Sequence, residues 1–186
     1  MSSQFANAPM MYQPVPNPID YTSVEIAAAM AEAFPEQVKK TGLMYANYAG
    51  TIDTKDKVVA AYPEFGFEFL DCDQVYAISG EADYKPFAQR LKDCGAEVVY
   101  FAGGFPAFPN WLEAAAQLDY HPIILADANF YDDNFAASNT DGLADNVYIR
   151  GVFKPLFEAA DNPATATYID LVEKSGGRSG HFKAAR

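Results

Sequence analysis

The stretch that decides the fold class runs from Asp83 to Gly104 and reads DYKPFAQRLKDCGAEVVYFAGG. Asp83 is typical of a helix start, and Gly95 is typical of a helix end because glycine adopts the left-handed conformation without steric cost. The residues from Val98 to Phe101 are uniformly apolar, which predicts a strand covered on both faces. The pair Gly103-Gly104 predicts a tight turn into another helix. Helix, buried strand and turn in this order indicate an α/β fold.

The same alternation continues on both sides of this stretch. Short apolar runs predict strands, and the segments between them predict helices bounded by glycine, proline or a capping residue. Apolar strands that alternate with helices predict a Rossmann-like parallel sheet, with helices on both faces and right-handed crossovers. Strands are expected at 42–47, 65–70, 98–101, 123–126 and 147–149, and helices at 24–34, 51–62, 83–94, 111–118 and 164–174.

The composition excludes several classes of protein. The chain has 186 residues, of which 50% are hydrophobic and 15% aromatic, enough for the core of one domain. Its 13 basic and 25 acidic residues give a net charge of −12, which argues against a nucleic-acid partner. No apolar run approaches the roughly 20 residues of a membrane-spanning helix, so direct insertion into a membrane is not expected. The first residues lack the basic and apolar regions of a secretory signal.

The predicted topology selects the loops where a ligand would bind. In an open parallel α/β sheet, ligands bind beyond the carboxyl ends of the strands. The four loops that follow the predicted strands, at 48–51, 71–73, 103–109 and 127–132, are rich in aromatic and small residues and contain no Lys or Arg. They lack the glycine patterns of phosphate and dinucleotide sites, so we expect no nucleotide cofactor.

The sequence gives little support for a metal or catalytic site. There is no G-x-S-x-G motif, and His121 precedes a strand at the end opposite the ligand loops. We therefore expect no metal and no catalytic residue. An enzyme of flavodoxin-like or hydrolase type stays as an alternative, because clustered aspartates can act as a general acid and a general base. The same aspartates could instead be solvated acids on an acidic surface. The aspartates concerned are Asp71, Asp73, Asp127, Asp132 and Asp133.

The two cysteines allow two arrangements. If Cys72 follows the strand at 65–70 and Cys94 ends the next helix, the helix holds them more than ~10 Å apart. A disulfide needs Cα atoms within about 7 Å. The segment 71–82 is nevertheless long enough to fold back and bring the two cysteines together. The sequence leaves this pairing open.

The block Gly80–Gly104 resembles the type I periplasmic binding proteins, and more narrowly the branched-chain amino-acid (Leu/Ile/Val) receptor family of ABC transporters. That family carries a helix of pattern D-(F/Y/W)-x-x-x-(V/A/I)-x-x-(L/I)-K. The stretch 118–126 is similar to a later segment of the family, and the resemblance extends from about residue 20 to residue 175. The helix pattern is matched by Asp83, Tyr84, Ala88, Leu91 and Lys92.

The resemblance implies a domain organisation. The family has two α/β lobes joined by crossing segments, and a ligand is trapped in the cleft between them. Residues 1–20 would be the end of lobe one and a hinge crossing, and 21–150 the ligand-binding lobe two. Residues 151–186 would be the second crossing and a truncated return to lobe one. On this basis the chain looks like a fragment, mainly lobe two.

The resemblance also implies a function. It predicts an extracytoplasmic solute-binding component of an ABC importer, with no enzymatic activity. Its partners would be a small-molecule ligand and the membrane permease, and its place the periplasmic or extracellular face of a bacterial membrane. The ligand would be a small amino acid, an amide, or an apolar or aromatic carboxylate. A ligand-sensing domain of a receptor or regulator is the alternative within the same fold.

Four ligand-binding residues follow from this resemblance. Tyr48 matches an aromatic that covers the ligand, and Phe105 matches one that packs on its side chain. The family's acid, which pairs with the ligand's ammonium group, aligns near Ala128, so Asp127 is the candidate from the adjacent position. Phe130 would add a further apolar contact. For each aromatic, packing in the core or hinge is the alternative.

Overall fold

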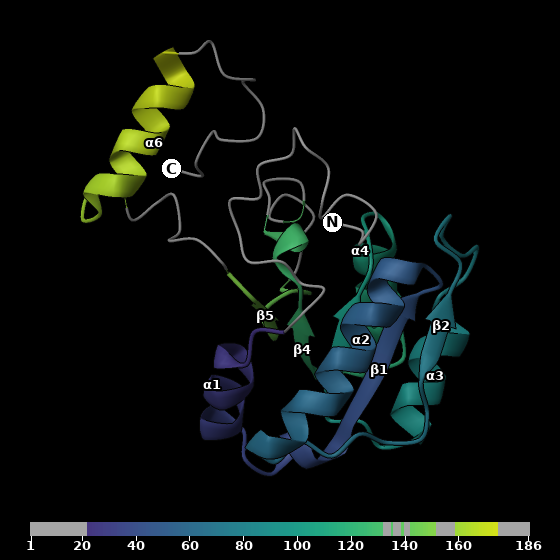
Figure 1. Ribbon diagram of the computed structural model, residues 1–186. Coiled ribbons are helices and arrows are strands. Elements are labelled where there is room, and N and C mark those ends of the chain that lie inside the picture. Colours follow the sequence, from purple (N-terminus) through teal and green to yellow (C-terminus); the bar gives the residue numbers. More distant parts are fainter. Residues whose placement is uncertain (1–21, 132–134, 136–138, 140–141, 152–158, 175–186) are drawn as a thin grey trace.

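A parallel sheet forms the centre of the structure, a computed structural model that describes residues 22–131, 135, 139, 142–151 and 159–174. Five strands lie in the order β2-β1-β3-β4-β5 (Figure 1). Every neighbouring pair is parallel, which confirms the predicted α/β fold class. The strands are β1 (Thr41–Ala46), β2 (Gln74–Tyr76), β3 (Val98–Ala102), β4 (Ile123–Ala126) and β5 (Val147–Ile149).

The helices fall close to the predicted ranges. The helix predicted at 111–118 begins earlier, at Ala107, and the others agree with the prediction to within about two residues. Gly95 adopts the left-handed conformation just after α3, with a φ of 80°, as predicted for a helix end. The helices are α1 (Glu25–Ala33), α2 (Ala49–Ala61), α3 (Lys85–Asp93), α4 (Ala107–Gln117) and α6 (Pro163–Lys174), with short 3-10 helices η2 (Gln37–Lys40), η3 (Tyr62–Phe65) and η4 (Ala128–Phe130).

The central strand β3 shows why the sheet needs two layers of helices. All five of its side chains are buried. Val99 and Phe101 belong to an apolar cluster that α3 and α4 complete, whereas Val98 and Tyr100 belong to one that α1 and α2 complete. Successive side chains of a strand point to opposite faces, so the uniformly apolar run requires cover on both sides. Figure 1 shows α2 on one face of the sheet and α3 and α4 on the other.

The strand order creates a switch point between β1 and β3. The chain leaves β1 through α2 to reach β2 on one side, and then crosses back through α3 to β3 on the other side of β1. The connections that leave β1 and β3 therefore run to opposite sides of the switch point, which is where ligands bind in open α/β sheets. This geometry selects the same edge of the sheet that the sequence indicated.

The edge strand differs from the prediction. The expected strand at 65–70 forms only one parallel bridge, between Phe69 and Thr41, and the ladder resumes at β2 against Met44–Ala46. Phe67 is instead buried against Tyr62, with ring centroids 5.1 Å apart, because the aromatic residues here fill the core beneath α1 and α2. The loop 71–73 consequently interrupts the edge strand and does not lie at its carboxyl end.

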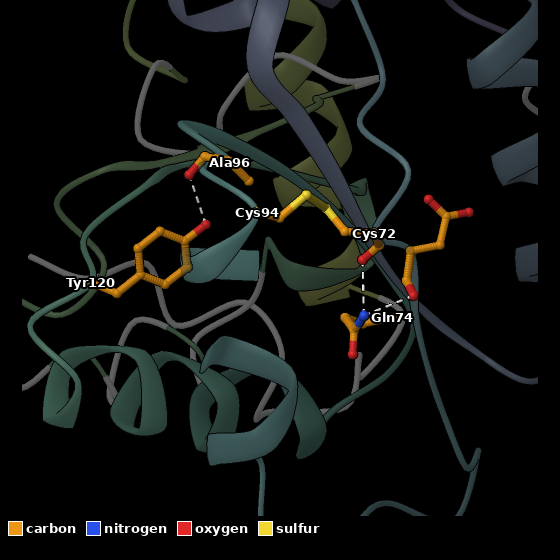
Figure 2. Close-up of a disulfide and its surroundings, with 6 residues drawn as sticks. Cys72, Gln74, Cys94, Ala96 and Tyr120 are labelled. Carbon is orange, nitrogen blue, oxygen red and sulfur yellow. Dashed lines mark hydrogen bonds between the residues drawn. A yellow bond between two sulfur atoms is a disulfide. The ribbon is translucent and has the colours of Figure 1, made fainter. Parts of the chain in front are cut away.

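A disulfide joins Cys72 to Cys94, with Cα atoms 6.4 Å apart (Figure 2). Cys72 lies before β2, at the amino end of that strand, and Cys94 follows α3, which ends at the same side of the sheet. The separation inferred from a strand at 65–70 was therefore wrong, and the fold-back arrangement is the observed one. Gln74 Nε2 also donates hydrogen bonds to the carbonyls of Cys72 and Asp73, each at 2.8 Å (Figure 2).

The ends of the chain are described only in part. Helix α6 lies away from the sheet and buries none of its residues (Figure 1). Residues 1–20, predicted to be the end of lobe one and a hinge crossing, lie outside the described residues. So do 152–158 and 175–186 of the segment predicted to be the second crossing and return, together with Asp132 and Asp133. No helix among the described residues is long and apolar enough to cross a membrane.

Candidate functional site

Four large apolar side chains are exposed at the carboxyl edge of the sheet, one after each of the first four strands. Tyr48 follows β1, Ile78 follows β2, Phe105 follows β3 and Tyr131 follows η4 and β4. Their exposed fractions are 48%, 61%, 46% and 52%, respectively. We call these four residues the apolar rim. Each of them lies on the side of the sheet where ligands bind in open parallel α/β folds.

Tyr48 is held at the start of α2 by a compact turn. Its N–H donates to the carbonyl of Ala46 at 2.8 Å, and Thr51 Oγ1 donates to the carbonyls of Ala46 and Tyr48 at 2.6 and 2.8 Å. A Cβ on Gly50 would lie 2.8 Å from Cε1 of the tyrosine ring. Glycine at position 50 therefore lets the ring of Tyr48 lie back against the helix start.

Hydrogen bonds at the glycine pair connect the end of β2 with the loops after β3 and β4. Gly104 N–H donates to Tyr76 Oη at 3.3 Å, and Asn129 Nδ2 donates to the carbonyl of Gly103 at 2.7 Å. A Cβ on Gly103 would lie 1.5 Å from Tyr76 Oη, so a larger residue requires Tyr76 to move. Burial raises the pKa of Tyr76 to about 12, which keeps its hydroxyl neutral. These contacts fix the loop that carries Phe105.

Phe130 lies in the core beneath this loop. It is fully buried, and its ring centroid lies 4.5 Å from that of Phe108 and 5.8 Å from that of Phe101. Of the four predicted ligand contacts, Tyr48 and Phe105 are therefore on the exposed edge, whereas Phe130 supports that edge from below. Trp111 on α4 is also fully buried.

Asp127 follows β4 and is held by two protein groups. Tyr100 Oη donates to its carboxylate oxygens at 3.2 and 3.3 Å, and Arg150 Nη2 lies 3.2 Å from Oδ1. The exposed fractions of the Asp127 and Arg150 side chains are only 18% and 21%. We call Tyr100, Asp127 and Arg150 the acid cluster. It links Tyr100, in the middle of β3, to the residues that directly follow β4 and β5.

Burial dominates the electrostatics of the acid cluster. It raises the pKa of the Asp127 carboxyl, while the charge of Arg150 and the hydrogen bond from Tyr100 lower it. Burial and the neighbouring Asp127 also raise the pKa of Tyr100 well above its usual value. The tyrosine therefore stays a neutral donor to the carboxylate at any physiological pH.

Sequence reasoning missed Arg150 and Tyr100. The loops after the first four predicted strands contain no Lys or Arg, whereas Arg150 directly follows the fifth strand. A basic residue in that position was a usable signal, because parallel strands bring their carboxyl ends to one edge. A tyrosine inside a buried strand was a second signal, since its hydroxyl needs a partner.

The other candidate residues do not meet at the carboxyl edge. Asp71 and Asp73 lie in the interruption of the edge strand, and β1 and β3 separate that strand from β4, which Asp127 follows. His121 lies before β4, where its Nε2 is 3.5 Å from Asp119. The described part of the chain contains no group of three or more His, Cys, Asp or Glu residues placed to hold a metal ion.

Solved structures share the fold of this chain. One is the leucine-, isoleucine-, valine-, threonine- and alanine-binding protein from Brucella ovis in a closed conformation, with a TM-score of 0.65 and 18% identity over 82% of this chain and 37% of that one. Another is a fatty acid ABC transporter substrate-binding protein from Thermomonospora curvata, with a TM-score of 0.63 and 15% identity over 82% of this chain and 39% of that one.

A third similar structure is a solute-binding protein of an ABC transporter from Rhodopseudomonas palustris BisB5 in complex with 3,4-dihydroxybenzoic acid. Its TM-score is 0.58, with 17% identity over 82% of this chain and 42% of that one. The chain thus spans about two fifths of the length of these structures. No curated protein matches the chain. The family model described as periplasmic binding protein matches residues 3–185. This chain belongs to the periplasmic binding protein family.

Proposed function

We propose that this chain contributes the ligand-binding lobe of an extracytoplasmic solute-binding protein that serves an ABC importer. The observation that carries the proposal is the apolar rim. Tyr48 and Phe105 follow β1 and β3, the two strands that flank the switch point, and both side chains are about half exposed. A ligand site needs apolar walls of this kind, together with a few fixed polar groups.

The apolar rim would form one wall of a ligand cleft between two lobes. We propose that residues 21–150 are lobe two, that 1–20 and 151–186 contain two hinge crossings, and that a first lobe lies largely outside this chain. The partial coverage of the similar structures supports this arrangement. Closure of the two lobes would bury a ligand between their facing surfaces and create the surface that a membrane permease recognises.

The disulfide supports an extracytoplasmic location. Cys72 is 3% exposed and bridged to Cys94 at the edge of the main core. Such bridges form and persist in oxidising compartments, including the bacterial periplasm and the cell surface. We therefore propose that the protein works on the outer side of a bacterial membrane, with a permease as its partner.

We propose a binding role without catalysis. The enzymatic alternative rested on clustered aspartates, and two of these, Asp73 and Asp127, are separated by two strands of the sheet. Asp127 is also engaged by Tyr100 and Arg150, so its carboxylate serves structure. A small molecule can be bound and released by a surface of matching shape that offers apolar contacts and a few hydrogen bonds.

A thermal-shift panel on the 186-residue chain tests this function. A single lobe offers half of the contacts, so we expect weak binding, with no tight association by calorimetry. At ten times its Kd, a ligand stabilises the chain by about 1.4 kcal/mol, a rise in Tm of roughly 3–5 °C. We expect such a rise with at least one of benzoate, L-leucine or 4-methylpentanoate at millimolar concentration.

Matched variants test whether the ligand-induced rise in Tm depends on the apolar rim. Combining Tyr48→Ala with Phe105→Ala is expected to abolish the rise in Tm, because it removes two of the four rim side chains. Tyr168→Ala removes an aromatic that is 47% exposed on α6, away from the rim, and is expected to preserve it. A rise in Tm that survives the double substitution, or tight calorimetric binding by the single lobe, contradicts the proposal.

A further inference from the structure

The carboxylate of Asp127 is already paired within the protein. It is the acidic residue that directly follows a described strand at the ligand edge, and it is the candidate for pairing with a ligand's ammonium group. Its oxygens accept hydrogen bonds from Tyr100, and Arg150 Nη2 lies 3.2 Å from Oδ1. The charge of the carboxylate is therefore balanced by a fixed guanidinium before any ligand arrives.

This pairing disfavours a cation at the same place. A ligand ammonium that approached Asp127 would also approach Arg150, and the repulsion from the guanidinium offsets much of the attraction. Binding would also remove the ammonium from water without giving it an unpaired carboxylate in return, which is unfavourable in a closed site. The acid cluster thus works against a ligand that carries a positive charge.

The other described acids in the loop after β2 are engaged as well. Glu81 Oε1 accepts a hydrogen bond from the N–H of Ala77 at 2.6 Å. Asp83 Oδ1 accepts one from the N–H of Lys85 at 2.9 Å, at the start of α3. Their positions are set by the backbone of the loop and helix start.

We infer that the ligand of this lobe is an apolar or aromatic molecule without an ammonium group. The inference rests on the proposed function and narrows it, because the apolar rim supplies the contact surface and the acid cluster supplies no free negative charge. It separates this chain from binders of free amino acids, whose ammonium group requires an available carboxylate or equivalent acceptors.

Two probes that differ only by the ammonium group give the sharpest test. L-leucine and 4-methylpentanoate share one carbon skeleton and one carboxylate, and 3-methylbutylamine keeps the ammonium while lacking the carboxylate. The Kd of each, together with that of benzoate, is measured on the 186-residue chain from its amide NMR shifts at millimolar ligand. We expect 4-methylpentanoate and benzoate to bind at least tenfold more tightly than leucine, and the amine to bind more weakly still.

The outcomes separate this inference from the proposed function. If leucine or the amine binds as tightly as 4-methylpentanoate, with shifts at the rim, the inference is overturned and the proposed function stands. If no probe shifts the rim amides, the proposed function fails and the inference fails with it. Tyr48→Ala is expected to weaken 4-methylpentanoate and benzoate, whereas Tyr168→Ala should leave both affinities unchanged. Equal effects of these two variants contradict a site at the rim.

Discussion

Arg150 Nη2 lies 3.2 Å from Asp127 Oδ1 and thereby joins the residue that follows β5 to the residue that follows β4. Both side chains are largely buried, and Tyr100 Oη donates to the same carboxylate from β3. The carboxyl ends of β4 and β5 are thus joined by an ion pair, and a hydrogen bond from the middle of β3 connects that strand to the same carboxylate. This link stabilises the edge that carries the apolar rim, and it makes the stability of the chain depend on Arg150.

Replacing Arg150 with methionine is expected to destabilise the chain by about 1–3 kcal/mol at pH 7, below the value for a fully buried pair because the side chains keep some exposure. Without the guanidinium, the pKa of Asp127 in the folded state rises further. A folded-state pKa above the unfolded value means that stability falls as pH rises through it, so the loss should be smaller at pH 4 than at pH 7. Urea denaturation at both values measures this difference.

A surface pair provides the control for this substitution. Lys174 Nζ lies 2.6 Å from Asp170 Oδ2 on α6, where the two side chains are 71% and 54% exposed. Lys174→Met is expected to change the free energy of unfolding by less than about 0.5 kcal/mol at either pH. An Arg150→Met variant as stable as the control at pH 7 would show that the acid cluster contributes nothing to stability.

Gly103→Ala is expected to destabilise the chain by about 1–3 kcal/mol, because the added methyl group collides with the hydroxyl of Tyr76. The ideal Cβ would lie 1.5 Å from Tyr76 Oη and 2.7 Å from Cζ. Tyr76→Phe should therefore relieve part of the loss in the double variant, and a double-mutant cycle by chemical denaturation measures the coupling. Gly104→Ala meets no atom within 4 Å and serves as the neighbouring control. Equal losses from the two alanine variants contradict this explanation.

Removing the disulfide should lower stability markedly. Cys72 and Cys94 are separated by 22 residues in sequence, and closing a loop of this length in the unfolded chain is worth about 3 kcal/mol. The combined Cys72→Ala and Cys94→Ala substitutions are expected to cost about 2–4 kcal/mol in urea denaturation, and so is reduction of the unmodified chain. A reductant should leave the double variant unchanged. If a reductant leaves the free energy of unfolding of the unmodified chain unchanged, the disulfide between Cys72 and Cys94 is contradicted.

Buried tyrosines predict a loss of stability at alkaline pH. Burial raises the pKa of Tyr62 and Tyr76 to about 12, and raises those of Tyr100 and Tyr120 as well. Between the usual value of about 10 and these raised values, the unfolded chain loses protons that the folded chain keeps. The free energy of unfolding should therefore be constant near pH 8 and fall progressively above pH ~10. Urea denaturation at several alkaline pH values, with tyrosinate absorbance as the second measurement, checks this. A stability that is flat or rising in this range contradicts it.

The sequence predicted those parts of the fold that depend on local patterns. The run from Val98 to Phe101 has no polar side chain except one hydroxyl, so only a strand covered on both faces accommodates it. The segment 65–70 looked equally strand-like. Its aromatic residues instead fill the core under α1 and α2, because Gly66 takes the left-handed conformation and a 3-10 helix precedes it. The local pattern could not distinguish these two uses of Phe67.

The candidate site was predictable only in part for a similar reason. Tyr48 and Phe105 could be placed from strand ends alone, because parallel strands share one carboxyl edge. Phe130 has the same aromatic character, but its burial against Phe108 depends on the course of η4, which is a tertiary property. The pairing of Asp127 with Arg150 joins residues 23 positions apart through the adjacency of β4 and β5, and that adjacency could not be read from either residue.

The loops at the carboxyl edge are proposed to form one side of a ligand cleft, and a residue-by-residue map of amide NMR shifts tests this proposal most directly. With millimolar benzoate added to the 186-residue chain, we predict that the largest shifts fall at 48–51, 77–80, 103–105 and 127–131. Largest shifts at the opposite edge, around His121 and the disulfide, or shifts spread evenly over the chain, would contradict the account.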